Sequence, residues 1–282
     1  NDTFLDSKPF KQRYAKFNGN NTSIEIPFSR DTRGLTTESH TISVLCRVFQ
    51  KPEEKKIFLI GDKKNEYVEY PILRIPGYDY GLALSFTFWN IFSAHNYMWL
   101  KRYDGQWSWV TVTVDTDNKL THFYLNGSEV DSKAGHGSPS PLKFNGKLKP
   151  YGNKPIYLGS TPSQQDGSPL KYLKGDIAKV FAWKRCLSPD EVKNLHTNLP
   201  SDDLVIDLDF NNPISNHKLK NIDFVEEDIR VPNSIIPHRK EGRMRCLHHQ
   251  DEGLVNGKWA KGETTAANER RYVLQMQQDK ID

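Results

Sequence analysis

Aromatic and amide side chains gather in one stretch of the sequence, between residues 78 and 99. Flat aromatic rings stack on the C–H face of a sugar, and planar polar side chains bind its hydroxyl groups. We expect such residues at loops and strand ends, where a rigid scaffold presents its binding groups. The alternative is that Trp89 and Trp99 belong to the core. The densest mixture of these residue types consists of Tyr78, Asp79, Tyr80, Asn90, Asn96, Tyr97 and Trp99.

Three aspartates are candidates for a calcium site. Asp115 and Asp117 lie in a polar turn, and Asp166 lies in a segment rich in Gly, Ser and Pro. Ca²⁺ binds clustered oxygens from carboxylates, amides and backbone carbonyls. The alternative, which we favour, is ordinary turn chemistry, in which each carboxylate accepts hydrogen bonds from neighbouring backbone N–H groups.

A basic cluster lies near the C-terminal end, in PHRKEGRMRCLHH at 237–249. Such a cluster could dock an acidic partner, although a solvated charged face is the commoner use. The docking candidates are Arg239, Lys240, Arg243 and Arg245. A zinc site would have to come from His238, Cys246, His248 and His249. Their spacing matches no standard zinc finger, so we expect a surface loop instead.

Acidic side chains that could catalyse glycoside hydrolysis are few. Retaining glycosidases need two carboxylates at a fixed separation. The run Glu129-Val130-Asp131 lacks a third acid after it, and Asp207 and Asp209 alternate on one strand face as on any solvated sheet. No phosphate-binding loop, nucleophile-elbow or zinc-protease motif occurs. We therefore predict that the protein is not an enzyme.

The composition excludes several classes of protein. The chain has 282 residues, a net charge of +4 and a pI near 8.7, which is too mild for a nucleic-acid-binding protein. No run of 18 apolar residues predicts a membrane span. The three cysteines, Cys46, Cys186 and Cys246, are widely spaced and predict no disulfide framework. We expect Cys46 and Cys186 to be buried as small apolar residues.

The elements that position these residues are strands. In the stretch WSWVTVTVDTDNKLTHFYLNGSEVD at 107–131, Val110, Val112 and Val114 alternate with polar residues, which predicts a strand with one buried face. A second run follows from 120 to 125, and Asn126-Gly127 is a strong hairpin signal. The stretch therefore predicts an antiparallel meander.

Other stretches predict further strands, at 41–49, 57–60, 82–88, 96–102, 154–160, 175–183 and 204–210. The run Ser188-Pro189-Asp190-Glu191 predicts a short helix, with Ser188 as N-cap and Glu191 completing a capping box. We expect Leu187 and Val192 to form a hydrophobic staple beside it. The sequence thus predicts an N-terminal arm at 1–13, a β-sandwich at 14–210 and an appendage at 211–282, with a hairpin near 254–259 and a helix near 266–280.

The segment from about 14 to 210 resembles the laminin-G-like and pentraxin-like domains of the concanavalin A-like superfamily. The matching pieces are YAKFNGNNTSIEIP, ESHTISVLCRVF, WSWVTVTVDTDNKLTHFYLNGSEV, KPIYLGS and KGDIAKVFAWKRCLSPDEVKNLH, in the family's order. Relatives often carry His where this chain has Trp109, and Trp where it has Cys46; we expect both changes to be repacking of the core. The resemblance implies an all-β, two-sheet antiparallel jelly-roll sandwich that binds glycans or proteins, often with calcium.

The first functional hypothesis is a non-catalytic, lectin-like module that binds a glycan or glycoprotein. The second is a structural or attachment component of a virion or cell surface, in which residues 211–282 dock a neighbouring subunit. The third is an accessory module of a larger carbohydrate-active enzyme, such as a glycosyltransferase. All three favour an extracellular or virion surface over the cytoplasm.

Overall fold

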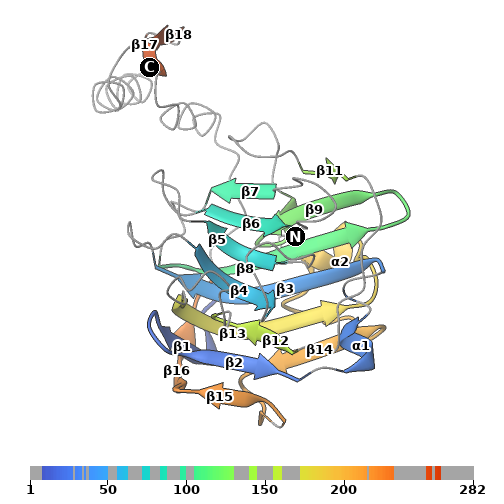
Figure 1. Cartoon of the computed structure of the whole chain (residues 1–282), viewed down its shortest axis with the longest axis vertical. Coiled ribbons are helices and arrows are strands. Elements are labelled where there is room, and N and C mark those ends of the chain that lie inside the picture. Colours follow the sequence, from blue (N-terminus) through green and yellow to red (C-terminus); the bar gives the residue numbers. More distant parts are fainter. Residues whose placement is uncertain are drawn as a thin grey trace. The chain divides into compact units, whose positions relative to one another are not determined.

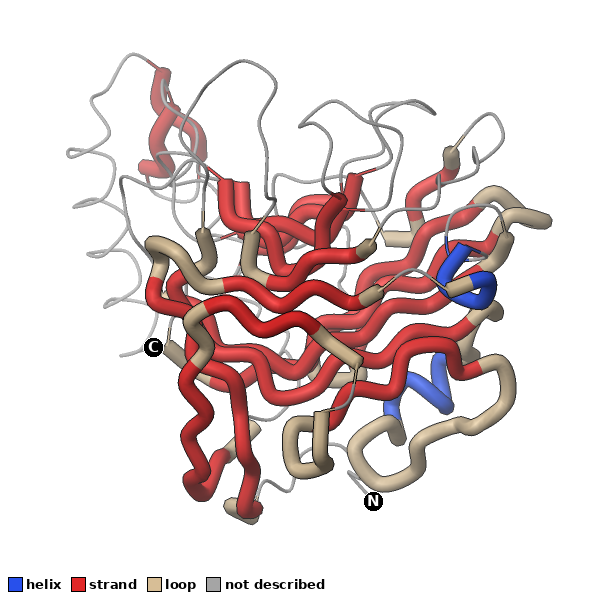
Figure 2. Tube along the Cα trace, turned by 60° about the horizontal axis from the view of Figure 1, so that its bottom comes forward, coloured by secondary structure: helices blue, strands red, loops and turns tan. Residues whose placement is uncertain are grey.

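The structure is a computed structural model of the whole chain. It describes residues 8–27, 29–33, 35, 38–49, 56–62, 72–76, 83–87, 96–99, 105–129, 140–144, 155–160, 172–214, 216–231, 252–255 and 258–261, with the strands at 56–99 and 252–261 described by their backbones. Strands dominate these residues, and the two short helices lie on one side of them (Figure 2). None of the helices among these residues is long and apolar enough to cross a membrane.

The first sheet, sheet A, follows the strand order β10-β9-β8-β3-β13-β1-β16, with every pair antiparallel. Two further strands join its flanks, β11 beside β9 and β14 beside β13. The strands are β1 (Phe10–Asn18), β3 (His40–Val48), β8 (Trp107–Asp115), β9 (Leu120–Leu125), β10 (Ser128–Glu129), β11 (Leu142–Lys143), β13 (Lys174–Trp183), β14 (Leu204–Asp209) and β16 (Asp223–Ile229).

The second sheet, sheet B, follows the order β15-β2-β12-β4-β5-β6-β7 and is also antiparallel throughout. Figure 1 shows its strands as a second layer over sheet A. The strands are β2 (Ser23–Ile26), β4 (Lys56–Asp62), β5 (Ile72–Pro76), β6 (Ala83–Thr87), β7 (Asn96–Trp99), β12 (Ile156–Leu158) and β15 (Lys218–Lys220). The predicted two-sheet antiparallel sandwich is confirmed.

The core lies between the two sheets, because alternate residues of each strand point into it. Sheet A contributes Phe17, Val44 and Val112, and sheet B contributes Ile24 and Leu158, all at most 1% exposed. The three alternating valines of β8 are all fully buried in this core, as their period-2 spacing predicts. Cys46 is also in this cluster, at 2% exposed.

The predicted meander is present as β8, β9 and β10. Its second turn places Asn126 at φ 49° and Gly127 at φ 78°, the two left-handed residues that a type I′ turn requires. The Asn126 side chain accepts a hydrogen bond from the backbone N–H of Trp109 at 2.8 Å. This bond anchors the turn to β8 and fixes the register of the hairpin.

A second apolar cluster covers the outer face of sheet A. Trp109, Phe181 and Trp183 lie in a row across it, with ring centroids 6.0 Å apart in each pair; the first pair is stacked and the second is tilted by 56°. Helix α2 (Pro189–Lys193) covers one end, and its Val192 is fully buried beside Leu187. The predicted burial of Trp109 and the packing of the two staple residues are therefore both confirmed.

The capping box predicted for α2 is also confirmed. The Ser188 hydroxyl accepts from the Glu191 backbone N–H at 3.2 Å, and the Glu191 carboxylate accepts from the Ser188 N–H at 2.8 Å. Arg185 donates two further hydrogen bonds to that carboxylate, at 2.9 and 2.6 Å. These donors lower the pKa of Glu191 to about 2, with the Arg185 hydrogen bonds as the largest cause.

The sandwich continues past residue 210, at which the sequence analysis placed its end. Strand β15 pairs with β2 in sheet B, and β16 pairs with β1 over seven residues in sheet A. The sandwich also begins inside the expected arm, because β1 starts at Phe10. Helix α1 (Arg30–Arg33) precedes β3.

A second compact unit contains residues 131–137 and 236–282. Its described part is a hairpin of β17 (Glu252–Val255) and β18 (Lys258–Lys261), as the Asn256-Gly257 turn predicts. The predicted helix near 266–280 lies outside the described residues.

Candidate functional site

Only three residues of the predicted glycan site lie on a described element. Tyr78, Asp79, Tyr80 and Asn90 lie outside the described residues. Asn96, Tyr97 and Trp99 occupy β7, the last strand of sheet B. The register of that sheet therefore decides on which of its two faces these three positions fall.

One row of directly paired residues crosses the whole of sheet B. It runs from β2 to β7 through Ile24, Leu158, Ile60, Leu73, Phe86 and Asn96. Directly opposed residues share a face of a sheet, and neighbours along a strand alternate between faces. Because Ile24 and Leu158 are buried in the core between the sheets, this row marks the core-facing side. Position 96 therefore belongs to the core side of the sheet.

Positions 97 and 99 belong to the outer face of sheet B. Tyr97 is opposite Ser85, which is opposite Arg74, and Trp99 is opposite Ala83. Positions 74, 85 and 97 are each next to a member of the core-facing row, and positions 83 and 99 lie three residues from one, so all five fall on the other face. Asn96 thus lies on the other face from the two aromatic positions, and the alternative of Trp99 as a core residue stays a prediction.

The other end of the same outer face is described with its side chains. Tyr157 of β12 is opposite Glu25 of β2, and its hydroxyl donates to the Glu25 carboxylate at 3.3 Å. Lys218 of β15 is opposite Glu25 as well, and its ammonium lies 2.9 Å from the other carboxylate oxygen. Tyr157 is 5% exposed, so this end of the face offers the charged groups of Glu25 and Lys218 to solvent and keeps the aromatic ring buried.

Polar and aromatic residue types therefore alternate with apolar ones across sheet B. The core-facing row is apolar from Ile24 to Phe86, whereas the outer positions include Glu25, Tyr157, Arg74, Ser85 and Tyr97. A face with aromatic rings and planar polar groups can stack on a sugar ring and bind its hydroxyls. We take this outer face of sheet B as the candidate site.

The calcium candidates are accounted for only in part. The Asp115 carboxylate accepts from the backbone N–H groups of Asp117 at 3.0 Å and Asn118 at 2.9 Å, and from the Asn118 amide at 2.7 Å. Partial burial opposes ionisation, but these hydrogen bonds lower the pKa of Asp115. Asp117 is exposed, and Asp166 lies outside the described residues. The Asp115 carboxylate thus forms the hydrogen bonds of an ordinary turn.

In the part of the chain that the structure describes, no three His, Cys, Asp or Glu side chains are grouped so as to hold a metal ion. Calcium binding stays a prediction. The basic docking candidates, Arg239, Lys240, Arg243 and Arg245, also lie outside the described residues, and so do His238, Cys246, His248 and His249.

A charged cluster on the outer face of sheet A was not predicted. The Arg47 guanidinium donates from Nε and Nη2 to one oxygen of Asp176, each at 2.8 Å, and its Nη1 lies 3.0 Å from Glu227. It also lies over the rings of Trp107 and Tyr14, 4.9 and 5.3 Å from their centroids. Burial raises the pKa of Asp176, which is 2% exposed, and the guanidinium opposes this rise.

Sequence reasoning missed this cluster because its members come from five strands that are far apart in the chain. Arg47 is opposite both Trp107 and Asp176 in the register, on β8 and β13. The only local signals were two charged residues in apolar runs: Arg47 near the end of the run at 41–49, and Asp176 near the start of the run at 175–183. Because the guanidinium is held by two carboxylates, the cluster ties β16 to the middle of the sheet.

A smaller polar cluster lies at the other edge of sheet A. The His122 Nδ1 and the Ser140 hydroxyl both bind one oxygen of Glu129, at 2.8 and 2.7 Å. The backbone N–H of Phe123 donates to that hydroxyl at 3.0 Å. Glu129, which we weighed as part of a catalytic run, therefore fastens the return of the chain at residue 140 to β9.

The two acids of β14 do not form a catalytic pair in their described surroundings. Asp209 accepts from the Gln12 amide and the Asn211 backbone N–H at 3.0 Å, and Lys179 lies 2.8 Å away. Burial opposes ionisation of Asp209, but these partners lower its pKa. Asp207 is exposed on the same strand. A general acid needs a raised pKa, so Asp209 is unsuited to that role.

The sequence of the chain matches a known protein family. A laminin-G-type family model, described as the concanavalin A-like lectin/glucanases superfamily, matches residues 18–193. The chain belongs to this superfamily. The match covers more than half of the chain and ends within helix α2, so β14, β15 and β16 lie beyond it.

Among solved structures, the chain is similar to a Bacteroides ovatus protein that is provisionally assigned as carbohydrate-binding. The TM-score is 0.59 at 17% identity, covering 80% of this chain and 63% of that one. It is also similar to a heptameric pentraxin of Limulus polyphemus, with a TM-score of 0.48 at 11% identity, covering 77% and 95%. At these identities the first likeness supports the fold.

Two plant proteins match part of the chain. The calpain-type cysteine protease DEK1 of Arabidopsis thaliana is 31% identical over 119 residues, which is 39% of this chain and 5% of that protein. DEK1 of Zea mays is 36% identical over 103 residues, 33% of this chain and 4% of that protein. The chain thus spans about a twentieth of the length of these relatives.

Proposed function

We propose that the protein is a non-catalytic module that binds a glycan on the outer face of sheet B, around Tyr97 and Trp99. The observation that carries this proposal is the register of sheet B. It assigns both aromatic positions, with Arg74 and Ser85, to the face opposite the core. Aromatic positions beside planar polar groups on one face are the combination that sugar recognition requires.

The superfamily and one neighbour favour the same function. Its name joins lectins and glucanases, and the Bacteroides ovatus protein is provisionally assigned as carbohydrate-binding. A fold alone does not specify an activity, so the argument depends on the site. The side of the sheet predicted to bind is defined by this chain's own strand pairing.

The described ionisable groups favour binding over catalysis. Asp209 is held by Lys179, and Asp176 is held by Arg47, so neither is free to act on a substrate. A cysteine protease requires a thiolate at neutral pH. Burial raises the pKa of the Cys46 thiol to about 12, and burial also raises that of Cys186. Neither thiol suits the chemistry after which the plant relatives are named.

A glycan array probed with the full chain tests the proposal. We expect binding to a restricted set of glycans, reduced at least about fivefold by Tyr97→Ala and by Trp99→Ala, since stacking on one ring contributes about 1 kcal/mol or more. Tyr78→Ala and Tyr80→Ala test the predicted loop in the same way. Repeating the array with a calcium chelator tests the calcium prediction.

The matched control is Phe49→Ala. Phe49 is an exposed aromatic residue, 37% accessible, and follows β3 in sheet A rather than sheet B. This variant should keep full glycan binding. Equal losses in the control and in Trp99→Ala, or undiminished binding in both Tyr97→Ala and Trp99→Ala, would refute the proposed site.

A second candidate function is that of an accessory module within a longer protein. The observation that favours it is the short match to plant proteins about twenty times longer than the matched segment. A parent enzyme or a surface assembly would each use the glycan-binding face to bring a larger body to its target. The reading frame of the parent gene distinguishes these arrangements directly.

A further inference from the structure

The free edges of the two sheets meet at one side of the sandwich, in the arch formed by residues 218–229. In the described chain, β15 is the last strand of sheet B and β16 is the last strand of sheet A. Asn221, at φ 50°, turns the chain between them, and its amide donates to the Asn21 carbonyl at 3.3 Å. The arch therefore lies along the β1–β2 arch and presents two open strand edges (Figure 1).

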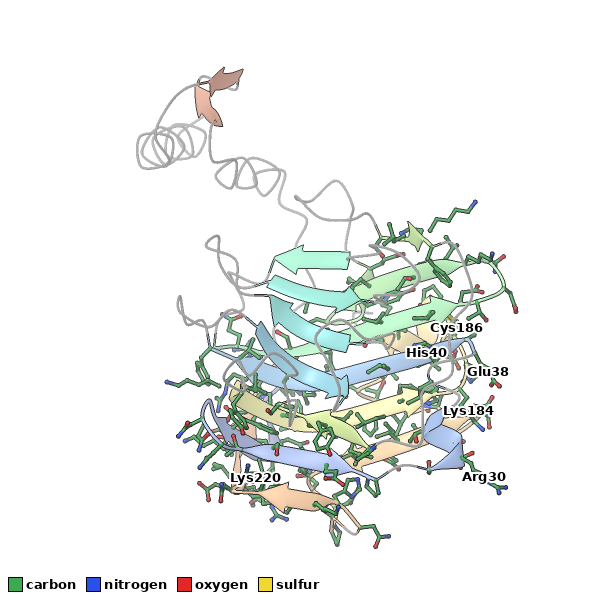
Figure 3. All side chains as sticks on the ribbon, viewed as in Figure 1. Arg30, Glu38, His40, Lys184, Cys186 and Lys220 are labelled. Carbon is green, nitrogen blue, oxygen red and sulfur yellow. The ribbon has the colours of Figure 1, made fainter. Side chains whose placement is uncertain are left out.

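The two legs of this arch carry opposite charges. The β15 leg is basic, with Lys218 and Lys220 exposed on either side of Leu219, which is 45% accessible. Figure 3 shows Lys220 on this strand. The β16 leg is acidic and exposes three carboxylates, those of Asp223, Glu226 and Asp228. Open strand edges are templates for pairing with another chain, so their charges decide which chain they accept.

Part of this charge has no ion-pair partner among the described residues. Lys218 lies 2.9 Å from Glu25, and Lys11 lies 2.6 Å from Glu226, both on the surface. Lys220, Asp223 and Asp228 form no ion pair with the described residues. Exposed pairs such as these are weak, so they leave the legs able to engage a partner.

We propose that two copies of this chain associate through the arch, with β15 of each copy beside β16 of the other. A two-fold axis parallel to the strands brings the basic leg of one copy against the acidic leg of the second, twice, in antiparallel fashion. A two-fold axis across the sheets would instead place β16 against β16 and repel. The charges therefore select the crossed arrangement, with the exposed Leu219 of each copy at the contact.

Sedimentation velocity of the full chain, at micromolar to sub-millimolar concentrations and at low and high salt, tests this proposal. We expect a reversible dimer that weakens with salt, because exposed charges are screened. The variant K218E/K220E makes both legs acidic, and D223K/E226K/D228K makes both legs basic, with three lysines against Glu227 on β16. Each should dimerise at least about tenfold more weakly than the wild type, since like charges then face each other.

An equimolar mixture of the two variants is the decisive arm, because it restores both opposite-charge contacts. We expect a mixed dimer of wild-type affinity, which also shows that both variants fold. The matched control K174E/K193E reverses two exposed lysines elsewhere, on β13 and α2, and should dimerise normally.

A wild-type chain that is monomeric at every concentration in low salt would overturn the proposal, and would show that the charges keep the edges apart. A mixture that stays monomeric although the wild type dimerises would overturn it as well, by assigning the dimer to another surface. Dimerisation weakened equally in the control would overturn it by showing a general charge effect. None of these outcomes bears on glycan binding to sheet B.

Discussion

The substitution Arg47→Met removes the cation from the charged cluster of sheet A while keeping a side chain of similar length. In the wild type this guanidinium is within 2.8 Å of Asp176 and 3.0 Å of Glu227. Asp176 is 2% exposed, and its second oxygen has no hydrogen-bond partner in the described part of the chain. Removal of the cation therefore leaves a buried carboxylate with no compensating charge.

The expected loss is large. Breaking a buried ion pair by removing one partner costs about 3–5 kcal/mol, because the other charge stays out of water. The cation–π contacts with Trp107 and Tyr14 add about 0.5–1 kcal/mol each, the range for contacts that solvent reaches. Glu227 contributes little, since its side chain is 39% exposed and can return to water. We expect a total of at least about 4 kcal/mol at neutral pH.

Urea denaturation at several pH values measures this loss. Burial raises the pKa of Asp176, and without Arg47 nothing opposes this rise. An acid whose pKa is raised on folding destabilises the folded state above the unfolded pKa of 3.8, and this penalty fades as the pH falls through the folded pKa. The gap between the variant and the wild type should therefore narrow on acidification.

The double variant Arg47→Met/Asp176→Asn is the control, because it removes the stranded charge as well. It should regain at least about 2 kcal/mol relative to Arg47→Met alone. The reasoning is refuted if Arg47→Met costs under about 1 kcal/mol at neutral pH, or if the double variant is less stable than the single one.

Three further predictions concern single residues. Glu191→Gln should lower the free energy of unfolding by about 1 kcal/mol at neutral pH, a value discounted for the solvent exposure of the carboxylate. Because the carboxylate stabilises the fold through its lowered pKa, the difference between variant and wild type should vanish as the pH falls from 4.5 towards 2. Thermal melts across that pH range measure it. Gly159→Ala should destabilise by about 2–4 kcal/mol in urea, because its φ is +78° and the new Cβ would lie 2.2 Å from the buried ring of Phe17; a loss near zero contradicts the packing. Cys46 should resist alkylation in the native protein and react once the chain is unfolded, since burial raises its thiol pKa to about 12; mass spectrometry of labelled peptides checks this, and rapid native labelling would count against it.

The sequence predicted those elements whose signal is local. The alternation of Val110, Val112 and Val114 and the Asn126-Gly127 turn specify β8, β9 and their hairpin without reference to the rest of the fold. Helix α2 was equally readable, because its cap requires only residues 188–191. Each of these patterns has one physical cause within a few residues of itself, and each was confirmed.

Strands that depend on distant partners were missed. Strand β5 lies in a tyrosine- and proline-rich stretch without a clear period, and its place comes from pairing with β4 and β6. Strands β15 and β16 are rich in charge and have one weakly buried face, so they resemble a surface tail. They fold as strands because β1 and β2 offer open edges 200 residues earlier in the chain. Edge strands of this kind leave little mark on the sequence.

The sequence indicated the residue types of the candidate site but not the face of the sheet on which each residue lies. Its residue types were evident, yet one position along β7 decides whether Tyr97 or Asn96 faces the core. That choice follows from five successive strand pairings and from the burial of Ile24 and Leu158. The predicted loop residues Tyr78 and Tyr80 lie outside the described residues, so their role in glycan binding stays a prediction.

Hydrogen–deuterium exchange of the full chain, with and without the strongest glycan from the array, tests the central claim most directly. We predict that bound glycan slows amide exchange in β6 and β7 of sheet B and leaves β3 and β8 of sheet A unchanged. Slowed exchange confined to sheet A, with β6 and β7 unaffected by a glycan that binds, would contradict it.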